Sequence, residues 1–149
     1  MEVHIAADHA GFELREHLIK HLTEKGYKVI DHGATEYDAL DAYPTMCIPC
    51  AEAVAKDTHA LGIVIGGSGN GEQIAANKVN GVRAALAWSE ATAALAREHN
   101  NANVIAVGAR QHSLAEATRF IEVFLETPFS NDPRHIERIN MLSDYETKR

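Results

Sequence analysis

The apolar residues of this chain follow two periods, which alternate from the first residues onward. The run Val3 to Ala7 is short, continuous and apolar, as is typical of a buried strand. The stretch GFELREHLIKHLTEKG that follows has its apolar residues three or four positions apart and closes on Gly26, which predicts a helix. A strand followed by a helix is therefore the unit to look for in the rest of the sequence.

The same alternation returns along the chain. Ser113 with Glu116 fits a capping box, and Asp132 before Pro133 is a helix start with proline at its first position, from which a last helix runs to about Tyr145. The pattern predicts strands at 27–31, 61–67, 82–88 and 103–108, and helices at 44–57, 72–79, 89–100 and 113–126.

Strands that alternate with helices are joined by right-handed crossovers and form a parallel sheet that is covered on both faces. We therefore predict an α/β fold: a Rossmann-like, doubly wound sheet of five parallel strands in an α/β/α sandwich, with an extra C-terminal helix. No repeat or linker interrupts the pattern, so residues 1–149 are predicted to form a single domain. In such sheets ligands bind outside the carboxyl ends of the strands.

Charge and composition narrow the classes of function. Fourteen Lys and Arg residues against 21 Asp and Glu give a formal net charge of −7, which argues against a broad nucleic-acid-binding surface. No apolar run approaches the about 20 residues of a membrane span, and the N-terminal MEVHIAADHAG does not follow the pattern of a signal peptide. We expect a cytoplasmic protein that binds neither nucleic acid nor membrane, whereas small anionic ligands remain possible.

Cys47 and Cys50 spell a CxxC pair, which in a cytosolic protein can be a dithiol redox site. Such a pair usually follows a buried strand and opens a helix, whereas this one follows the turn-like DALDAYPT. A four-thiolate zinc site would need a second pair, and the sequence has two cysteines in all. The favoured interpretation is two small buried thiols, with a redox site as the alternative.

Several polar loops should meet at the carboxyl edge of the predicted sheet. His99 and Asn100, in contrast, end a helix that leads into a strand, so they should lie at the opposite edge unless a second subunit supplies them. The loops that follow predicted strands carry Asp8-His9, Gly66 to Glu72, Trp88-Ser89 and Gly108-Ala109-Arg110.

The loop GGSGNGE has the form of an anion cradle that carries its own carboxylate. Gly66 and Gly71 have the spacing of a P-loop, but Glu72 stands where a nucleotide-binding loop needs lysine, and the dinucleotide fingerprint GxGxxG does not fit. Backbone N–H donors beside a carboxylate suit removal of a proton next to a carbonyl, with the donors holding the oxyanion that develops. The alternative is that Glu72 only stabilises the helix dipole.

Arg134 and Arg138 are four residues apart and share one helix face, with His135 adjacent. Together with Arg110 they would clamp a phosphate, although as a solvated charge pair they would need no function. Asp8 has a similar alternative, because it would also serve as the cap of the helix that follows.

Five segments carry a resemblance to a known family over nearly the whole chain: AADHAGFELREHL, AYP at 42–44, GGSGNGEQIAANKVNGVRAAL, AREHNNANVIAVGAR and RHIER. They resemble the type B ribose-5-phosphate isomerases. That family, which includes isomerases of six-carbon aldose phosphates, interconverts ribose 5-phosphate and ribulose 5-phosphate without metal or cofactor. The resemblance implies a phosphorylated sugar as substrate and a homodimer with active sites between subunits, with a tetramer as the alternative.

The resemblance also implies a role for each matching residue. Glu72 would move the proton between C1 and C2, His99 would open the furanose ring, and Asp8 would take a hydroxyl proton. The remaining residues would bind the substrate: the backbone of Gly67, Ser68, Gly69, Asn70 and Gly71 as the anion hole, Ser68 and Asn100 on the sugar, Tyr43 near the site, His9, Arg110, Arg134 and Arg138 on the phosphate, and His135 close to that end.

The chain departs from one branch of this family. That branch has a cysteine base at the end of the third strand, where this sequence has Gly66, and an apolar residue at the position of Glu72. The chain therefore resembles the branch that uses a carboxylate. A six-carbon aldose phosphate such as allose 6-phosphate is an alternative substrate, and a sugar-phosphate-binding module without catalysis is an alternative function.

Overall fold

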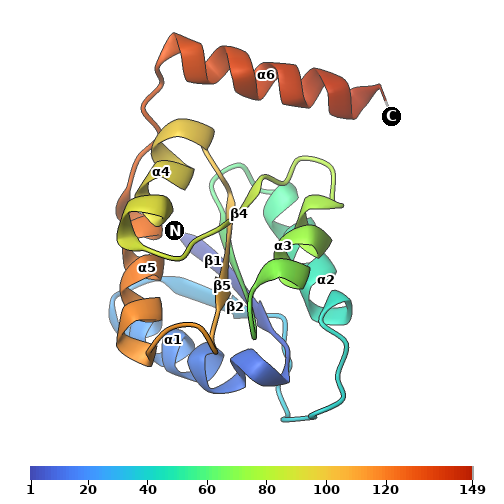
Figure 1. Cartoon of the computed structure of the whole chain (residues 1–149), viewed down its shortest axis with the longest axis vertical. Coiled ribbons are helices and arrows are strands. Elements are labelled where there is room, and N and C mark those ends of the chain that lie inside the picture. The colour runs from blue at the N-terminus through green and yellow to red at the C-terminus, as the bar shows by residue number, and fades with distance from the viewer. Residues whose placement is uncertain (149) are drawn as a thin grey trace.

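A computed structural model describes residues 1–148 and contains the predicted α/β fold (Figure 1). Five parallel strands form one sheet in the order β2-β1-β3-β5-β4. β3 is buried along its whole length, as expected of a central strand covered on both faces. The strands are β1 (Glu2–Ala7), β2 (Lys28–Asp31), β3 (Leu61–Gly66), β4 (Ala84–Leu86) and β5 (Val104–Gly108).

Helices cover both faces of the sheet, which confirms the α/β/α sandwich. α1, α4 and α5 lie on one face and α2 and α3 on the other, with α4 packed on α5 and α2 packed on α3 (Figure 1). The predicted extra helix, α6, crosses beyond the amino-terminal edge of the sheet. The helices are α1 (Phe12–Glu24), α2 (Pro44–Ala55), α3 (Asn70–Asn77), α4 (Glu90–Asn100), α5 (Leu114–Glu126) and α6 (Pro133–Thr147).

The core follows from the two-residue period of the strands. Val3, Ile5 and Ala7 point from β1 into the layer of α1, α4 and α5, whereas Ala6 points into the layer of α2 and α3. All four residues are fully buried. The apolar runs recognised in the sequence are therefore the central strands of a sheet with two hydrophobic faces.

Local capping sets several helix boundaries as predicted. Ser113 and Glu116 form the capping box of α5, and Asp132 caps α6 by accepting a hydrogen bond from the backbone N–H of Arg134. α3 begins two residues earlier than predicted, at Asn70, because Gly69 adopts a left-handed conformation with φ 85° and serves as the N-cap. Glu72 consequently lies in the first turn of the helix.

β4 is the edge strand and is shorter than the predicted 82–88. Its free edge is covered by Asn77, whose side-chain amide exchanges two hydrogen bonds with the backbone of Ala84. The strand then ends because the backbone N–H of Trp88 donates to the hydroxyl of Thr92 and so joins the cap of α4. A side chain that pairs with an edge strand protects it from pairing with another chain.

α6 stands apart from the packed layers. None of its residues is buried, and Ile136, Met141, Leu142 and Tyr145 are large apolar residues that it exposes. Its contacts with the rest of the chain include a few with α4 and a hydrogen bond from the backbone of Gly81 to Glu146. Within residues 1–148, no helix combines the length and the apolar character that crossing a bilayer requires.

A histidine pair between β1 and the end of β2 predicts loss of stability in acid. Nδ1 of His4 and Nε2 of His32 are 2.8 Å apart, and burial lowers the pKa of both rings from the ordinary value of 6.5. Below that value the unfolded chain takes up protons that the folded chain does not, so the free energy of unfolding should fall as pH drops. Urea unfolding at about pH 7.5 and about pH 5.5 measures this loss.

His32→Gln is the matched variant, because glutamine keeps a hydrogen-bonding group but does not titrate. Its free energy of unfolding should fall less between the two pH values than that of the unsubstituted chain. An equal loss in the variant would show that the histidine pair is not responsible.

Candidate active site

Glu72 occupies a pocket that exists because Gly66 has no side chain. Its exposed fraction is 4%. A Cβ atom added to Gly66 would lie 2.0 Å from Oε1 of Glu72 and 2.1 Å from its Cδ, far inside contact distance. A side chain at position 66 and a carboxylate at position 72 therefore exclude each other. This steric relation explains why a chain that has glycine rather than cysteine at position 66 has a glutamate at position 72.

The surroundings of Glu72 make its carboxyl group a weaker acid than usual. Burial raises the pKa above the ordinary value of 4.5, and the nearby carboxylate of Asp8 acts in the same direction. A hydrogen bond from the backbone N–H of Glu72 and the charge of His9 oppose this shift. A carboxylate with a raised pKa in a buried site is a better proton acceptor than one in water.

The glycine loop brings backbone N–H groups next to this carboxylate. Gly66 accepts a hydrogen bond from the backbone of Ala109 at 2.8 Å, and Gly67 accepts one from Arg110 at 3.1 Å, so the loop is fixed against the end of β5. The α3 helix starts at Asn70, and the first N–H groups of a helix have no partner within the helix. They are therefore suited to hold an anion.

Two side chains of the predicted site pack directly on the loop. A Cβ atom at Gly71 would lie 2.6 Å from the ring of Tyr43, so the tyrosine covers the first turn of α3. A Cβ atom at Gly67 would lie 3.4 Å from Cδ and Nη1 of Arg110, and Arg110 is exposed. The loop thus lies between an aromatic ring and a guanidinium group that solvent and ligands can reach.

Asp8 and His9 follow β1 at the same edge of the sheet. One oxygen of Asp8, Oδ1, accepts hydrogen bonds from the backbone of Ala10 at 2.9 Å and Gly11 at 3.4 Å, so Asp8 is the predicted cap, here of a short 3-10 turn (His9–Gly11). Within residues 1–148 no hydrogen bond uses the other oxygen, Oδ2, which is available to a ligand. Capping and ligand binding are therefore compatible in one side chain.

Asp41 holds His9 and was not recognised in the sequence. Its Oδ1 accepts from the backbone N–H of His9 at 3.0 Å and lies 2.9 Å from the ring Nδ1. A carboxylate on Nδ1 fixes the ring orientation and leaves Nε2 for a ligand. The loop position of Asp41, 32 residues from His9, gives no periodic signal that would have identified it.

Asp8, His9 and Asp41 are the residues with which the described part of the chain could hold a metal ion. The potential ligand atoms of Asp8, His9 and Asp41 lie within 4.8 Å of one another. Hydrogen bonds from the backbone of Ala10 and of His9 already engage Oδ1 of Asp8 and Oδ1 of Asp41, respectively. Oδ2 of Asp8 makes no hydrogen bond within residues 1–148, and Oδ2 of Asp41 is buried without a partner. The sequence-based expectation that no metal is needed stays a prediction.

The other predicted site residues lie at the opposite edge of the sheet. His99 and Asn100 end α4, at the same edge of the sheet as α6 (Figure 1). The ring centroid of His99 is 4.4 Å from that of His135 at the start of α6. Arg134 and Arg138 are exposed on the same helix. The chain therefore divides its candidate residues into a carboxyl-edge group and an amino-edge group, as the topology predicted for His99. The amino-edge group consists of His99, Asn100, Arg134, His135 and Arg138.

The two cysteines are buried free thiols in α2, as the favoured interpretation expected. Neither has any exposed surface. Burial raises the pKa of Cys50 to about 12 and that of Cys47 further, and the carboxylate of Glu72 adds to the shift at Cys47. Reactive thiols need a lowered pKa and access, so these properties argue against a dithiol redox site.

Comparisons with known proteins agree with one another. The sequence profile described as Ribose/Galactose Isomerase matches residues 3–142. Ribose-5-phosphate isomerase B of Mycobacterium tuberculosis is 56% identical over 146 residues, which cover 98% of this chain and 90% of that protein. The crystal structure of ribose-5-phosphate isomerase B from Mycoplasma genitalium with bound ribulose 5-phosphate superposes with a TM-score of 0.96 at 41% identity, covering 99% and 97% of the two chains. The type B enzyme of Trypanosoma cruzi gives a TM-score of 0.94 at 38% identity, covering 100% of both chains.

The contact between Gly66 and Glu72 predicts the effect of adding one methyl group. In Gly66→Ala the carboxylate must leave its buried position, so the pKa of Glu72 should fall from its raised value toward 4.5. Carbon-detected NMR of the glutamate carboxyl groups measures this pKa, with the signal assigned by its loss in Glu72→Gln.

Gly67→Ala is the control, because the added methyl group would contact Arg110 rather than Glu72. The pKa of Glu72 should stay raised in that variant. A raised pKa that persists in Gly66→Ala would mean that the pocket does not depend on the missing side chain.

Proposed function

Because the chain belongs to the ribose/galactose isomerase family, we propose that it interconverts ribose 5-phosphate and ribulose 5-phosphate, with Glu72 as the base. The observation that carries the proposal is the buried carboxylate of Glu72 beside the backbone N–H groups of the glycine loop. An aldose–ketose isomerisation needs a base next to a site that stabilises an oxyanion. The relatives at 56% identity named ribose-5-phosphate isomerase B support the five-carbon sugar.

The proposed chemistry moves one proton between neighbouring carbons of the open-chain sugar. Glu72 takes the proton from C2, the C2–H electron pair forms a C1–C2 double bond, and the electrons of the carbonyl go to O1, which gives a cis-enediolate. Glu72 then returns the proton to C1, and the hydroxyl group on C2 gives its proton to Asp8 and becomes the new carbonyl. The proton passes from Asp8 to O1, which becomes the hydroxyl group of the ketose. No electron leaves the substrate, so the step needs no oxidant or reductant.

The remaining carboxyl-edge residues support this step in the proposal. The N–H groups of the Gly67–Gly71 segment hold the oxyanion, because the first N–H groups of α3 have no partner within the helix. Asp8 accepts the hydroxyl proton through Oδ2, since Oδ1 is engaged in capping. His9, held by Asp41, and the exposed Arg110 bind the phosphate group.

We propose that the amino-edge group completes the site of a second copy of the chain in a homodimer. His99 would protonate the ring oxygen to open the furanose, Asn100 would hydrogen-bond the sugar, and Arg134 and Arg138 would close around the phosphate. Two observations support this sharing: these residues lie at the far edge from Glu72, and α6, which carries the arginines, exposes Ile136, Met141, Leu142 and Tyr145. A helix with an exposed apolar face is typical of an interface.

We also propose the cellular location and the oligomeric state of the enzyme. One domain, residues 1–149, would carry out the reaction without metal or cofactor, in the cytoplasm, where phosphorylated sugars are metabolised. A tetramer made of two such dimers would contain the same shared sites. A net charge of −7 is consistent with a small phosphorylated ligand held locally by arginines rather than with nucleic acid.

Replacing the base should abolish turnover and spare binding. In Glu72→Gln, kcat for ribose 5-phosphate should fall by about 10² to 10⁴-fold with KM nearly unchanged, because the neutral amide cannot accept the proton. In the unsubstituted enzyme kcat/KM should rise with pH up to a value above 4.5, where the raised pKa of Glu72 makes its carboxylate form predominate. Rates are measured with chelator present, for ribose 5-phosphate and allose 6-phosphate in parallel.

Glu52→Gln is the control, since Glu52 is an exposed glutamate on α2, and it should leave both constants unchanged. A Glu72→Gln variant with more than a few per cent of the normal rate would remove Glu72 from the role of base. If the enzyme converts only allose 6-phosphate, the proposed mechanism stands and the proposed substrate is wrong. If it converts neither sugar, a binding module without catalysis is favoured.

A further inference from the structure

Two arginines hold the turn that follows α4. Arg83, which precedes β4, donates from Nε to the carbonyl of Asn100 and from Nη2 to the carbonyl of Asn101, both at 2.9 Å. Arg97 donates from Nη1 to the side-chain oxygen of Asn101 at 3.0 Å and to the carbonyl of Ala102 at 2.5 Å. The last carbonyls of a helix have no partner within it, so the bond from Arg83 to Asn100 supplies a partner at the end of α4, and the other bonds hold the turn beyond it.

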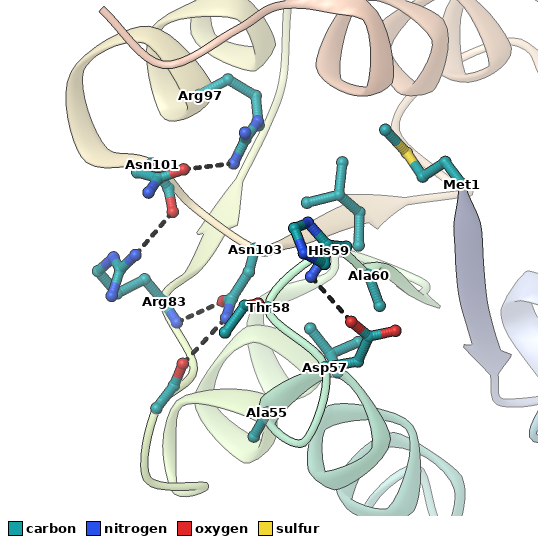
Figure 2. Close-up of a pocket in the computed structure, with 13 residues that line it drawn as sticks. Met1, Ala55, Asp57, Thr58, His59, Ala60, Arg83, Arg97, Asn101 and Asn103 are labelled. Carbon is teal, nitrogen blue, oxygen red and sulfur yellow. Dashed lines mark hydrogen bonds between the residues drawn. The ribbon is translucent and has the colours of Figure 1, made fainter. Parts of the chain in front are cut away.

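Figure 2 shows Arg83, Arg97 and Asn101 on one side of a pocket at the amino-terminal edge of the sheet, with the bonds that join both arginines to Asn101. Arg83 is itself fixed there, because its backbone N–H donates to the side chain of Asn103 at 2.8 Å, and the amide of Asn103 donates to the carbonyl of Gly81 at 2.9 Å. Both guanidinium groups are half-buried, and burial lowers the pKa of each. They are therefore anchored groups rather than mobile surface charges.

The turn matters because it carries residues of the amino-edge group. Asn101 has a left-handed conformation with φ 44°, which ends α4 directly after His99 and Asn100. Both of those residues are exposed, so the packing of the core does not hold their side chains. Their backbone positions depend on the turn, and the guanidinium of Arg83 is the group that spans its two consecutive carbonyls.

We propose that Arg83 is a positioning residue for His99 and Asn100, and that its loss impairs opening of the sugar ring while sparing proton transfer at Glu72. The inference rests on the proposed function. Arg83 acts through the backbone and does not itself touch the substrate. A displacement of a reacting group by about 1 Å can cost about 10²-fold in rate, so holding the turn is sufficient to affect catalysis.

The two substrates separate ring opening from proton transfer. Ribose 5-phosphate is mainly a furanose and must be opened before Glu72 can act on C2. Ribulose 5-phosphate stays acyclic, because the hydroxyl group that would close its five-membered ring carries the phosphate. Glu72 can therefore take a proton from C1 of the ketose and return a deuteron from solvent without any ring opening. Loss of this C1 proton signal in D₂O, followed by NMR, reports on the base alone.

The test compares Arg83→Met with the unsubstituted enzyme in both assays. We expect kcat for ribose 5-phosphate to fall by about 10²-fold with KM little changed, while deuterium exchange at C1 of ribulose 5-phosphate stays within about twofold of the normal rate. His99→Asn should give the same profile, and Glu72→Gln should lose both activities. Arg83→Lys, which keeps one donor group and the charge, should recover part of the kcat.

Arg119→Met is the matched control, because Arg119 is an exposed arginine on α5 paired with Glu90, and it should change neither activity. A parallel loss of isomerisation and exchange in Arg83→Met, or a loss of neither, would overturn the inference. If Arg83→Met does not fold, Arg83→Lys carries the test, and equal losses in its two assays would be the contradicting result. Failure of the unsubstituted enzyme to convert ribose 5-phosphate would instead count against the proposed function.

Discussion

The burial of one carboxylate is the constraint on which the rest of the candidate site depends. Glu72 is almost inaccessible to water, and burial raises its pKa, so its carboxylate accepts a proton more readily than one in water. The pocket requires the absence of a side chain at Gly66, and the first-turn position of Glu72 requires the left-handed conformation of Gly69. The same loop supplies backbone N–H groups, so the proposed base and the proposed anion hole have fixed relative positions.

The topology of the sheet places the candidate site residues in two groups, at opposite edges of the sheet. Residues that follow a strand reach the carboxyl edge, where Glu72, Asp8 and Arg110 lie, whereas residues that end a helix reach the other edge. His99 belongs to the second set, together with the arginines of α6. In the proposed dimer this separation makes association a condition of catalysis. The hydrogen bonds of Arg83 then become relevant to a reaction centre in the other subunit.

Much of the fold follows from local patterns, and less of the site does. Periodicity identified the strands and helices, and the cap residues Ser113 and Asp132 set helix starts correctly. The position of β5 between β3 and β4 results from packing between distant segments, which no local pattern records. Likewise, Glu72 was recognisable from its glycine-rich surroundings, whereas the contacts of Asp41 with His9 and of Arg83 with Asn100 join residues far apart in the sequence.

The most direct test of the account is complementation between two inactive variants. Glu72→Gln and His99→Asn subunits are mixed, dissociated and reassociated, and isomerisation of ribose 5-phosphate is measured, with each variant treated alone as the control. A shared site predicts that every mixed dimer has one intact site, so random pairing should restore about a quarter of normal activity. Mixed dimers that form but stay inactive would show that Glu72 and His99 do not act in one site across the interface.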